Sequence, residues 1–414
     1  MITREHFDTL ETRDPEERER AALAALRRQV AHAKAHAPGF AAILAGVDPA
    51  AIDSRAALAA LPVTRKSDLV ARQKAARPFG GLAAVARGGA GHYFASPGPI
   101  YEPAGRQPDW WRLARSLFAA GFRAGDLLHN AYAYHMTPAG AMLESGALAL
   151  GCSVFPGGTG QTELQLAAMA DLAPDGYVGT PSFLRILLDK ADADGIALPS
   201  LTKAQVSGEP FPPSLRDALA ARGIAAYQVY ASADLGSIAY ESAAREGLIV
   251  DEGVLLEILR PGTGDPVADG EVGEVVVTAL ANAEYPLIRF ATGDLSAVLA
   301  GASPCGRTNL RIKGWMGRAD QTTKVKGMFV HPAQVAAVAR RHAEIGRARL
   351  VVDNPDGVDR MTLHCEVAGS DPALAAAIVD SLREVTKLRG EAALREPGSL
   401  PNDGKVIDDT RTYR

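Results

Sequence analysis

Four charged residues in this chain have types and spacings that could perform chemistry on a phosphorylated ligand. Asp294 follows an apolar run in PLIRFATGDLS, and its carboxylate could accept two hydrogen bonds from a vicinal diol. Arg318 and Asp320 lie in the polar, glycine-bounded stretch GWMGRADQTTKVKG, and Lys405 follows Gly404 near the C-terminus. A mobile cation such as this lysine could offset negative charge that develops at phosphorus. Each feature also has an ordinary interpretation: a Gly-Asp turn after a strand, a solvated loop of mixed charge, and an isolated lysine.

The composition indicates a protein of more than one domain that does not bind nucleic acid. The chain has 414 residues, of which 47% are hydrophobic, and this is enough for a substantial core. The formal net charge is −4, and no basic stripe runs along the sequence. Nucleic acid is therefore not an expected partner.

The cysteine and targeting signals are those of a cytoplasmic protein. Cys152, Cys305 and Cys365 are too few and too scattered for a disulfide framework, and they fit a reducing compartment. The N-terminal stretch MITREHFDTLETRDPEERER is charged and lacks the apolar centre of a signal peptide. No apolar run reaches the roughly 18 residues of a membrane span. We therefore expect a cytoplasmic enzyme or binding protein without a membrane partner.

The elements that would position the charged residues follow from the periodicity of the sequence. Residues 14–45 have helical spacing, and Ser67 is expected to cap a helix that starts near Leu69. Between about 109 and 230, helical stretches alternate with short apolar runs, which predicts parallel strands covered by helices. Strands are expected within DLLHNAYAY, GCSVFP, DGYVGTP, KAQVSGEP and AAYQVYA, and helices at 139–150, 162–172 and 213–222.

The pattern changes after residue 247, where β-rich runs and turn sequences such as PGTGDP predict a mainly antiparallel subdomain at about 247–313. A polar connector follows at 314–327. The expected fold class is α/β. Residues 1–316 would form a large N-terminal domain of mixed sheets with covering helices plus the β-rich subdomain, and residues 317–414 a small, mobile α+β lid.

The chain resembles the phenylacetate–CoA ligase family, a branch of the adenylate-forming acyl-CoA synthetases. The resemblance runs nearly from end to end, through LPVTRKSDL, NAYAYHMTPAG, GTPSFLRIL, VSGEP, YASADLG, PLIRFATGDLS, GRADQTTKVKGMFVHPAQV and DGKVID. It implies a site between a large N-terminal domain and a mobile C-terminal domain. It also implies ATP or AMP, CoA and Mg²⁺ as ligands.

The resemblance implies a nucleotide-binding role for several residues. Asp294 would hold the ribose hydroxyls, and Tyr230 would stack on adenine, although a core tyrosine is the alternative. A glycine in the adenine loop would let the backbone approach the base closely. The residues of that loop and the remaining nucleotide contacts would be Ser207, Gly208, Glu209, Pro210, Ser232, Arg318, Ser96 and Gly98.

The resemblance also implies an acid pocket, a hinge and a catalytic lysine. Tyr132, Tyr134 and His135 would line the pocket, because aromatic walls suit a planar or apolar acid, with burial in the core as the alternative. Asp320 would be the hinge about which the C-terminal domain rotates between adenylation and thioester formation. Lys405 would reach the carboxylate and the α-phosphate during adenylation.

The segment that corresponds to the phosphate loop of the family departs from its pattern. Relatives have Ser-Ser-Gly-Thr-Thr-Gly-Lys-Pro where residues 96–103 of this chain are SPGPIYEP. Both threonines are absent, Tyr101 replaces the second glycine, Glu102 replaces the lysine, and prolines remove backbone donors. A phosphate cradle needs N–H groups, hydroxyls and a cation, and Ser96 and Gly98 are most of what remains. Glu102 would repel the phosphates unless a metal ion lay between them.

Two further departures concern the α-phosphate and zinc. Relatives have Tyr-Gly-x-Thr-Glu where residues 230–234 are YASAD, so Ala233 replaces the hydroxyl that touches the α-phosphate. Ser232 could substitute for it, and Asp234 would be a shortened catalytic carboxylate that holds Mg²⁺. Of the zinc ligands in some relatives only Cys305 remains, and a structural zinc site needs about four, so no structural zinc is expected.

These features predict an acid–CoA ligase that activates an aromatic or similar carboxylic acid through acyl-AMP and then forms a thioester with CoA. The changed phosphate loop favours an alternative, a non-catalytic or altered homologue that binds AMP, an acyl-adenylate or CoA. A third possibility is an adenylating enzyme with a non-CoA acceptor, such as an amine or a carrier thiol. The expected partners are a small carboxylic acid, a nucleotide and CoA, and a homodimer is the default assembly.

Overall fold

The computed structural model describes residues 5–260, 264–319, 323–326, 328–330, 332–369, 371–401 and 406–411. The chain divides into two compact units, Met1–Met316 and Gly317–Arg414. Each unit has its own sheets and hydrophobic core. Two of the predicted site residues, Asp320 and Lys405, lie outside the described residues.

A nine-stranded sheet runs through the first unit in the order β14-β15-β10-β9-β8-β7-β6-β4-β5. Strands β5, β4, β6, β7 and β8 are parallel neighbours, and the pairs from β8 to β14 are antiparallel. The strands are β4 (Leu127–Asn130), β5 (Ser153–Phe155), β6 (Gly176–Gly179), β7 (Lys203–Val206), β8 (Ala225–Ser232), β9 (Gly236–Tyr240), β10 (Leu248–Val250), β14 (Val298–Leu299) and β15 (Arg311–Ile312). The predicted parallel strands are therefore confirmed.

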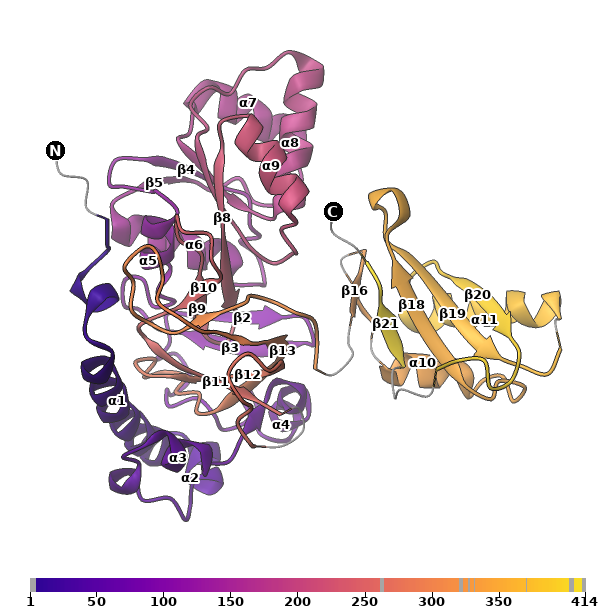
Figure 1. The fold of residues 1–414 in the computed structure, drawn as a ribbon, viewed down its shortest axis with the longest axis horizontal. Coiled ribbons are helices and arrows are strands. Elements are labelled where there is room, and N and C mark those ends of the chain that lie inside the picture. Colours follow the sequence, from indigo (N-terminus) through magenta and orange to yellow (C-terminus); the bar gives the residue numbers. More distant parts are fainter. Residues whose placement is uncertain are drawn as a thin grey trace. The chain divides into compact units, whose positions relative to one another are not determined.

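Five helices connect or cover the strands of this sheet: α5 (Leu113–Ala119), α6 (Ala139–Leu150), α7 (Thr162–Leu172), α8 (Pro181–Asp194) and α9 (Pro213–Ala221). Helices α7, α8 and α9 lie beside the parallel strands (Figure 1). On α8, Leu184, Leu187, Leu188 and Ala191 recur at helical spacing and are buried, so one face of this helix packs on the sheet. The helix ends at Gly195, which adopts the left-handed conformation with φ of 69°.

A second sheet and a hairpin complete the β structure of the first unit. The sheet has the order β1-β13-β12-β11, in which β1 is parallel to β13 and the other pairs are antiparallel. The hairpin pairs β2 with β3. Their bounds are β1 (Thr64–Arg65), β2 (His92–Ser96), β3 (Ile100–Ala104), β11 (Val254–Leu259), β12 (Gly273–Ala279) and β13 (Phe290–Ser296).

The segment that follows β1 differs from the sequence prediction. Lys66–Asp68 form the 3₁₀ turn η3, and α4 (Leu69–Ala75) begins after Asp68 without a side-chain cap. The predicted capping role of Ser67 is therefore wrong, because its hydroxyl donates to the Asp68 carboxylate instead, at 3.4 Å. The register places Arg65 opposite Ala291, so this segment enters the unit beside the strand that carries Asp294.

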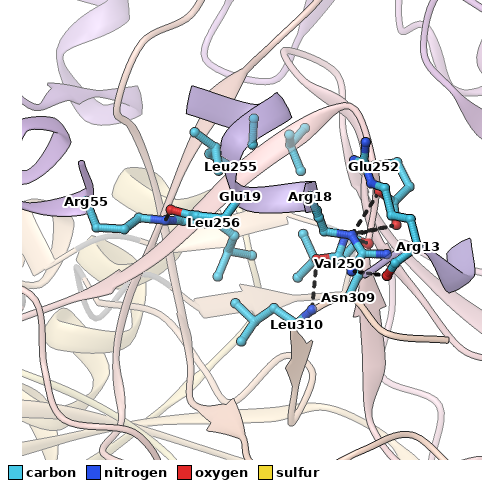
Figure 2. Close-up of a pocket in the computed structure, with 12 residues that line it drawn as sticks. Arg13, Arg18, Glu19, Arg55, Val250, Glu252, Leu255, Leu256, Asn309 and Leu310 are labelled. Carbon is cyan, nitrogen blue, oxygen red and sulfur yellow. Dashed lines mark hydrogen bonds and ion pairs between the residues drawn. The ribbon is translucent and has the colours of Figure 1, made fainter. Parts of the chain in front are cut away.

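The N-terminal helices are fastened to the β-rich part by buried ion pairs. They are η1 (Thr9–Thr12), α1 (Pro15–His36), α2 (Pro38–Ile43), η2 (Pro49–Ala51) and α3 (Arg55–Ala59). Arg13 and Arg18 both bind the Glu252 carboxylate, at 2.9 and 3.1 Å (Figure 2). The small cavity beside them, of about 30 Å³, is lined by none of the predicted site residues. We interpret this cluster as structural, since the arginine charges are already paired.

The second unit is a small α+β fold. A four-stranded sheet has the order β20-β19-β18-β21, and β16 and β17 form a separate pair. The elements are β16 (Thr323–Val325), β17 (Met328–Val330), α10 (Pro332–Ala339), β18 (Ala348–Asp353), η4 (Pro355–Gly357), β19 (Arg360–Glu366), α11 (Pro372–Thr386), β20 (Glu391–Arg395) and β21 (Ile407–Asp409). The predicted α/β class is confirmed.

None of the helices in the described part of the chain is long and apolar enough to cross a membrane.

Candidate active site

Asp294 lies inside β13 rather than in a turn at the end of a strand. Residues 292–294 oppose Val275 alone, so β13 bulges at this point. Gly293 permits the bulge with φ of 78°, and the Thr292 hydroxyl donates to the Val275 carbonyl at 3.0 Å. The Asp294 N–H in turn donates to the Thr292 hydroxyl at 3.1 Å. A bulge redirects a side chain, and here it directs the Asp294 carboxylate toward two aromatic donors.

Both carboxylate oxygens of Asp294 accept hydrogen bonds from aromatic side chains. Tyr230, on β8, donates its hydroxyl to Oδ2 at 2.9 Å. Trp315 donates its indole N–H to Oδ1 at 3.1 Å. The fold thus brings the predicted residues Tyr230 and Asp294 together across two sheets. Trp315 was not predicted, although it precedes the GRAD motif in the sequence.

The predicted adenine loop follows β7 and lies beside a buried tyrosine. Gly208 has φ of 81°, a conformation that glycine adopts easily. The Ser207 N–H donates to the Gly179 carbonyl at 3.4 Å, and the Tyr132 hydroxyl donates to the same carbonyl at 2.9 Å. Burial, and to a lesser extent the charge of Glu209, raises the pKa of Tyr132. The structure therefore brings the loop at 207–210 next to one member of the predicted acid pocket.

The three predicted pocket residues differ in exposure. Tyr132 is buried in the main core, Tyr134 is partly buried and His135 is exposed. The Tyr134 hydroxyl accepts a hydrogen bond from Asn130 at 2.7 Å, and burial and Glu144 raise its pKa. Tyr132 and Tyr134 are therefore held in place by their side chains, whereas the hydrogen bond at His135 is to its backbone carbonyl, from the Thr137 N–H at 2.8 Å.

The segment that replaces the phosphate loop is a tight hairpin. Ser96 ends β2 and pairs with Ile100 of β3, so residues 97–99 make the turn between them. Glu102 points inward and is only 2% exposed. The Ser96 hydroxyl donates to Glu102 Oε1. Ser96 is one of the few phosphate-binding residues expected from the sequence, and its hydroxyl is therefore already hydrogen-bonded.

A lysine from another segment reaches this end of the site. Lys66 Nζ lies 2.5 Å from Asp234 Oδ2, and the Asp234 side chain is fully buried. Burial opposes the charge of Lys66, but Asp234, and then Glu102 and Asp294, outweigh this effect and raise its pKa. Lys66 was not predicted, although its segment LPVTRKSDL belongs to the resemblance described above.

Glu102 and Asp234 each keep one carboxylate oxygen without a protein partner. Burial and then the charge of Asp234 raise the pKa of Glu102 to about 8. Among the described residues, Glu102 Oε2, Asp234 Oδ1 and the Tyr285 hydroxyl are buried without a hydrogen-bond partner. Burial, and then the charges of Asp234 and Glu102, raise the pKa of Tyr285. Oxygen ligands fit Mg²⁺, which proteins often hold with one or two carboxylates plus substrate phosphates. Within the described residues, no cluster of three or more His, Cys, Asp or Glu could hold a metal, so phosphate oxygens would have to complete the shell.

The positions of the remaining predicted residues do not test the roles expected for them. The Ser232 hydroxyl accepts the Leu235 N–H at 3.3 Å, in the turn that carries Asp234. Gly98 lies in the turn of the hairpin. Arg318 is a partly buried residue at the start of the second unit. The roles of these residues stay predictions.

Cys305 has an unusual environment for a free cysteine. Its sulphur accepts hydrogen bonds from Ser242 at 3.3 Å and from Arg307 at 3.5 Å, and it lies 3.1 Å from the Ser303 hydroxyl. Burial opposes the thiolate, but these bonds outweigh it and lower the pKa of Cys305 to about 7. The absence of structural zinc at this position stays a prediction.

Comparisons with known proteins agree with one another. A family model described as AMP-binding enzyme matches residues 113–283. The phenylacetate-coenzyme A ligase of Thermus thermophilus is 33% identical over 360 residues, which are 83% of this chain and 80% of that protein. The corresponding ligase of Escherichia coli is 31% identical over 358 residues, 81% of this chain and 79% of that protein. A crystal structure of 2-hydroxyisobutyryl-CoA ligase in complex with 2-HIB-AMP and CoA matches this chain with a TM-score of 0.81. The match covers 100% of this chain and 94% of that chain. The sequences are 24% identical, so the similarity is one of fold.

Proposed function

Because the chain belongs to the phenylacetate–coenzyme A ligase family, we propose that it activates an aromatic or similar carboxylic acid as an acyl-AMP and passes the acyl group to CoA. As a member of this family it is an AMP-forming acid–CoA ligase that uses ATP and CoA. The first step joins the acid carboxylate to the α-phosphate and releases pyrophosphate. The second step replaces AMP with the CoA thiol.

The observation that carries the proposal is the position of the Asp294 carboxylate. Its two oxygens accept hydrogen bonds from Tyr230 and Trp315. A ribose presents two adjacent hydroxyls, which can donate to the same two oxygens. A ribose can therefore take the place of the aromatic donors, and Tyr230 would then turn its ring toward the base.

At the other end of the nucleotide, we assign the phosphates to the region of Ser96, Lys66 and Asp234. Lys66, which pairs with Asp234, is proposed as a cation for the phosphates, and a Mg²⁺ ion that Asp234 would hold would neutralise further phosphate charge. Lys405 is proposed to assist adenylation, Arg318 to contact the nucleotide, and Asp320 to act as the hinge. Each of these roles rests on the family pattern.

Tyr132 and Tyr134 are proposed to line the pocket for the acid. Tyr132 is bound to Gly179 and Tyr134 to Asn130, so both rings are held rigidly before a ligand arrives. Rigid aromatic walls favour a flat or apolar acid, because little side-chain entropy is lost on binding.

The direct test is isotope exchange from pyrophosphate into ATP, with a panel of aromatic and short aliphatic acids. We expect exchange that depends on an aromatic or similar acid. Replacing Lys405 with Ala should lower the exchange rate by about 100-fold if this lysine offsets charge at the α-phosphate. Lys190→Ala, a partly exposed lysine on α8, is the matched control.

Two outcomes would contradict the assignment. If no acid supports exchange while AMP still binds, the chain is an altered nucleotide-binding homologue. If exchange survives Lys405→Ala, this lysine loses its proposed role. The homodimer expected from the sequence also stays a proposal, and light scattering on the purified protein decides it.

A further inference from the structure

A buried asparagine lies at the carboxyl end of the strand from which the predicted acid-pocket segment emerges. Asn130 is the last residue of β4 and is fully buried, and β4 pairs in parallel with β5 and β6. In open sheets of parallel strands, ligands bind beyond the carboxyl ends of the strands. A polar side chain that is buried at such an end is therefore well placed to organise the residues that meet a ligand.

The side chain of Asn130 forms hydrogen bonds with three groups of the segment that follows it. Its Oδ1 accepts the Tyr132 N–H at 3.1 Å, and its Nδ2 donates to the Tyr134 hydroxyl at 2.7 Å and to the Gly140 carbonyl at 2.9 Å. A backbone N–H needs an acceptor and a carbonyl needs a donor, so these partners determine which end of the amide faces which group. An ionised aspartate has the same shape but no N–H to donate.

The Tyr134 ring is enclosed by the loop that these bonds hold together. The Gly140 N–H donates to the Ala133 carbonyl at 2.9 Å, which closes the loop at 133–140. A Cβ atom at residue 140 would lie 2.8 Å from Cδ2 of Tyr134, so the ring packs directly against the backbone at the start of α6. Asn130 binds both the hydroxyl of this ring and the carbonyl of Gly140, and it thereby fixes the ring relative to the helix.

The same asparagine also holds the second aromatic residue of the pocket. It fixes the backbone of Tyr132 through the Tyr132 N–H, and the Tyr132 hydroxyl donates to the Gly179 carbonyl at the end of β6, at 2.9 Å. The positions of the two rings relative to one another therefore depend on one side chain. Because Asn130 is fully buried, it acts on a ligand only through these rings.

We propose that Asn130 is a positioning residue for the acid pocket and that it determines selectivity among carboxylic acids by fixing the Tyr134 ring relative to Tyr132. The inference rests on the proposed function, in which these two tyrosines line the pocket. A fixed ring favours an acid of one shape, and a displacement of about 1 Å can cost about 100-fold in rate. The nucleotide contacts proposed at Asp294 do not involve Asn130, so the choice of acid should change without a change in AMP affinity.

Pyrophosphate exchange with the panel of acids tests this role in Asn130→Asp, which keeps the acceptor for Tyr132 and removes both donors. We expect KM for the preferred acid to rise at least about tenfold. The preference for it over a short aliphatic acid, as the ratio of kcat/KM values, should fall about tenfold, while AMP affinity stays within about twofold. Asn309→Asp is the matched control, because its amide donates to the Val250 carbonyl and accepts the Leu310 N–H outside the proposed pocket. This control should leave the preference unchanged.

Tyr134→Phe keeps the ring and removes only the hydroxyl that Asn130 binds, so it decides the question if Asn130→Asp does not fold. We expect the preference to fall about threefold, and the double variant to lose less than the product of the two single effects. An unchanged preference in Tyr134→Phe would overturn the inference, and so would independent effects in the double variant. A loss in Asn130→Asp that is equal for every acid would show a role in folding alone.

The unchanged protein separates this inference from the proposed function. If it catalyses exchange with no acid, the proposed function is wrong and the role of Asn130 is removed with it. If it catalyses exchange with an acid that the variants prefer equally, only the role of Asn130 is wrong.

Discussion

The two ends of the candidate nucleotide site treat their carboxylates in opposite ways. At the adenosine end, Asp294 accepts hydrogen bonds from two neutral donors, Tyr230 and Trp315. At the phosphate end, Glu102 and Asp234 are buried, and each keeps an oxygen without a partner in the part of the chain that the structure describes. The difference teaches that the carboxylate at the adenosine end is satisfied by neutral donors, which is how sugar hydroxyls would satisfy it. At the phosphate end, by contrast, an anionic ligand meets two carboxylates, and the charge of Lys66 there is already paired with Asp234.

The two ends of the site also differ in the solvent exposure of their side chains. Trp315 is 47% exposed, so its hydrogen bond to Asp294 lies where a ligand can compete for it. Asp234 is 1% exposed, and charges at such depth act strongly on one another because water screens them little. Substitutions at the adenosine end should therefore change affinity, whereas substitutions at the phosphate end should change stability and chemistry.

The largest effect is expected at Asp294. Asp294→Ala removes the acceptor of two charge-assisted hydrogen bonds to the ribose, each worth about 1.5–3 kcal/mol. AMP affinity should fall at least about 100-fold, as measured by isothermal titration calorimetry. Asp171→Ala, on the exposed surface of α7, is the matched control and should not change the affinity. Unchanged AMP binding in Asp294→Ala would show that the ribose lies elsewhere.

A second test asks whether the two ends can be separated. Lys66→Met leaves Asp234 buried without its cation, which should lower the free energy of unfolding by about 2 kcal/mol. Pyrophosphate exchange should slow by about 10- to 100-fold because the cation at the phosphates is lost. AMP affinity should stay within about twofold.

The control for Lys66 is Lys74→Met, an exposed lysine on the neighbouring helix α4. Urea denaturation measures the stability, and isotope exchange measures the chemistry. If Lys66→Met lowered AMP affinity as strongly as it slowed pyrophosphate exchange, one substitution would affect both ends of the site. The proposed difference between the two ends would then be wrong.

Glu102→Lys sharpens the comparison by reversing the charge at the phosphate end. If the hairpin faces the phosphates, the new cation should speed turnover at limiting Mg²⁺ by about three- to tenfold. Glu163→Lys provides the same charge change on the exposed surface of α7. Steady-state rates across a Mg²⁺ series decide the question, and equal rates for both variants would show that the hairpin points away from the phosphates.

The smallest effect is expected at Trp315. Trp315→Phe removes the donor that competes with the ribose for Asp294 Oδ1, so AMP should bind about two- to fivefold more tightly, which corresponds to about 0.5–1 kcal/mol. Met316→Leu, the exposed neighbour, is the control. Weaker AMP binding in Trp315→Phe, again measured by calorimetry, would mean that the indole is a contact for the nucleotide and not its competitor.

Much of the fold was predictable from periodicity. Helices α6 and α7 occupy Ala139–Leu150 and Thr162–Leu172, the predicted ranges, because an apolar helical pattern ends at a residue with positive φ in each case, Gly151 and Ala173. The sequence suggested that the strand before Asp294 ends in a Gly-Asp turn, whereas β13 continues through Asp294 to Ser296. Its bulge depends on pairing with β12, which local sequence does not specify.

The candidate site was predictable only where a motif is continuous in the sequence. Lys66 and Asp234 are 168 residues apart, and no local pattern joins them. The burial of Glu102 was also not foreseen, because a lone glutamate in a turn-rich segment is normally exposed. Asp320 and Lys405 lie outside the described residues, and their roles rest on the family pattern.

The hydrogen bond from Trp315 to Asp294 has a practical consequence. The chain contains three tryptophans; Trp110 and Trp111 are 7% and 4% exposed, whereas Trp315 is 47% exposed. A soluble quencher of fluorescence should therefore reach Trp315 preferentially. If a ribose takes the place of Trp315 at Asp294, as proposed, the environment of this one indole changes. The fluorescence of Trp315 would then report nucleotide occupancy in real time without a label.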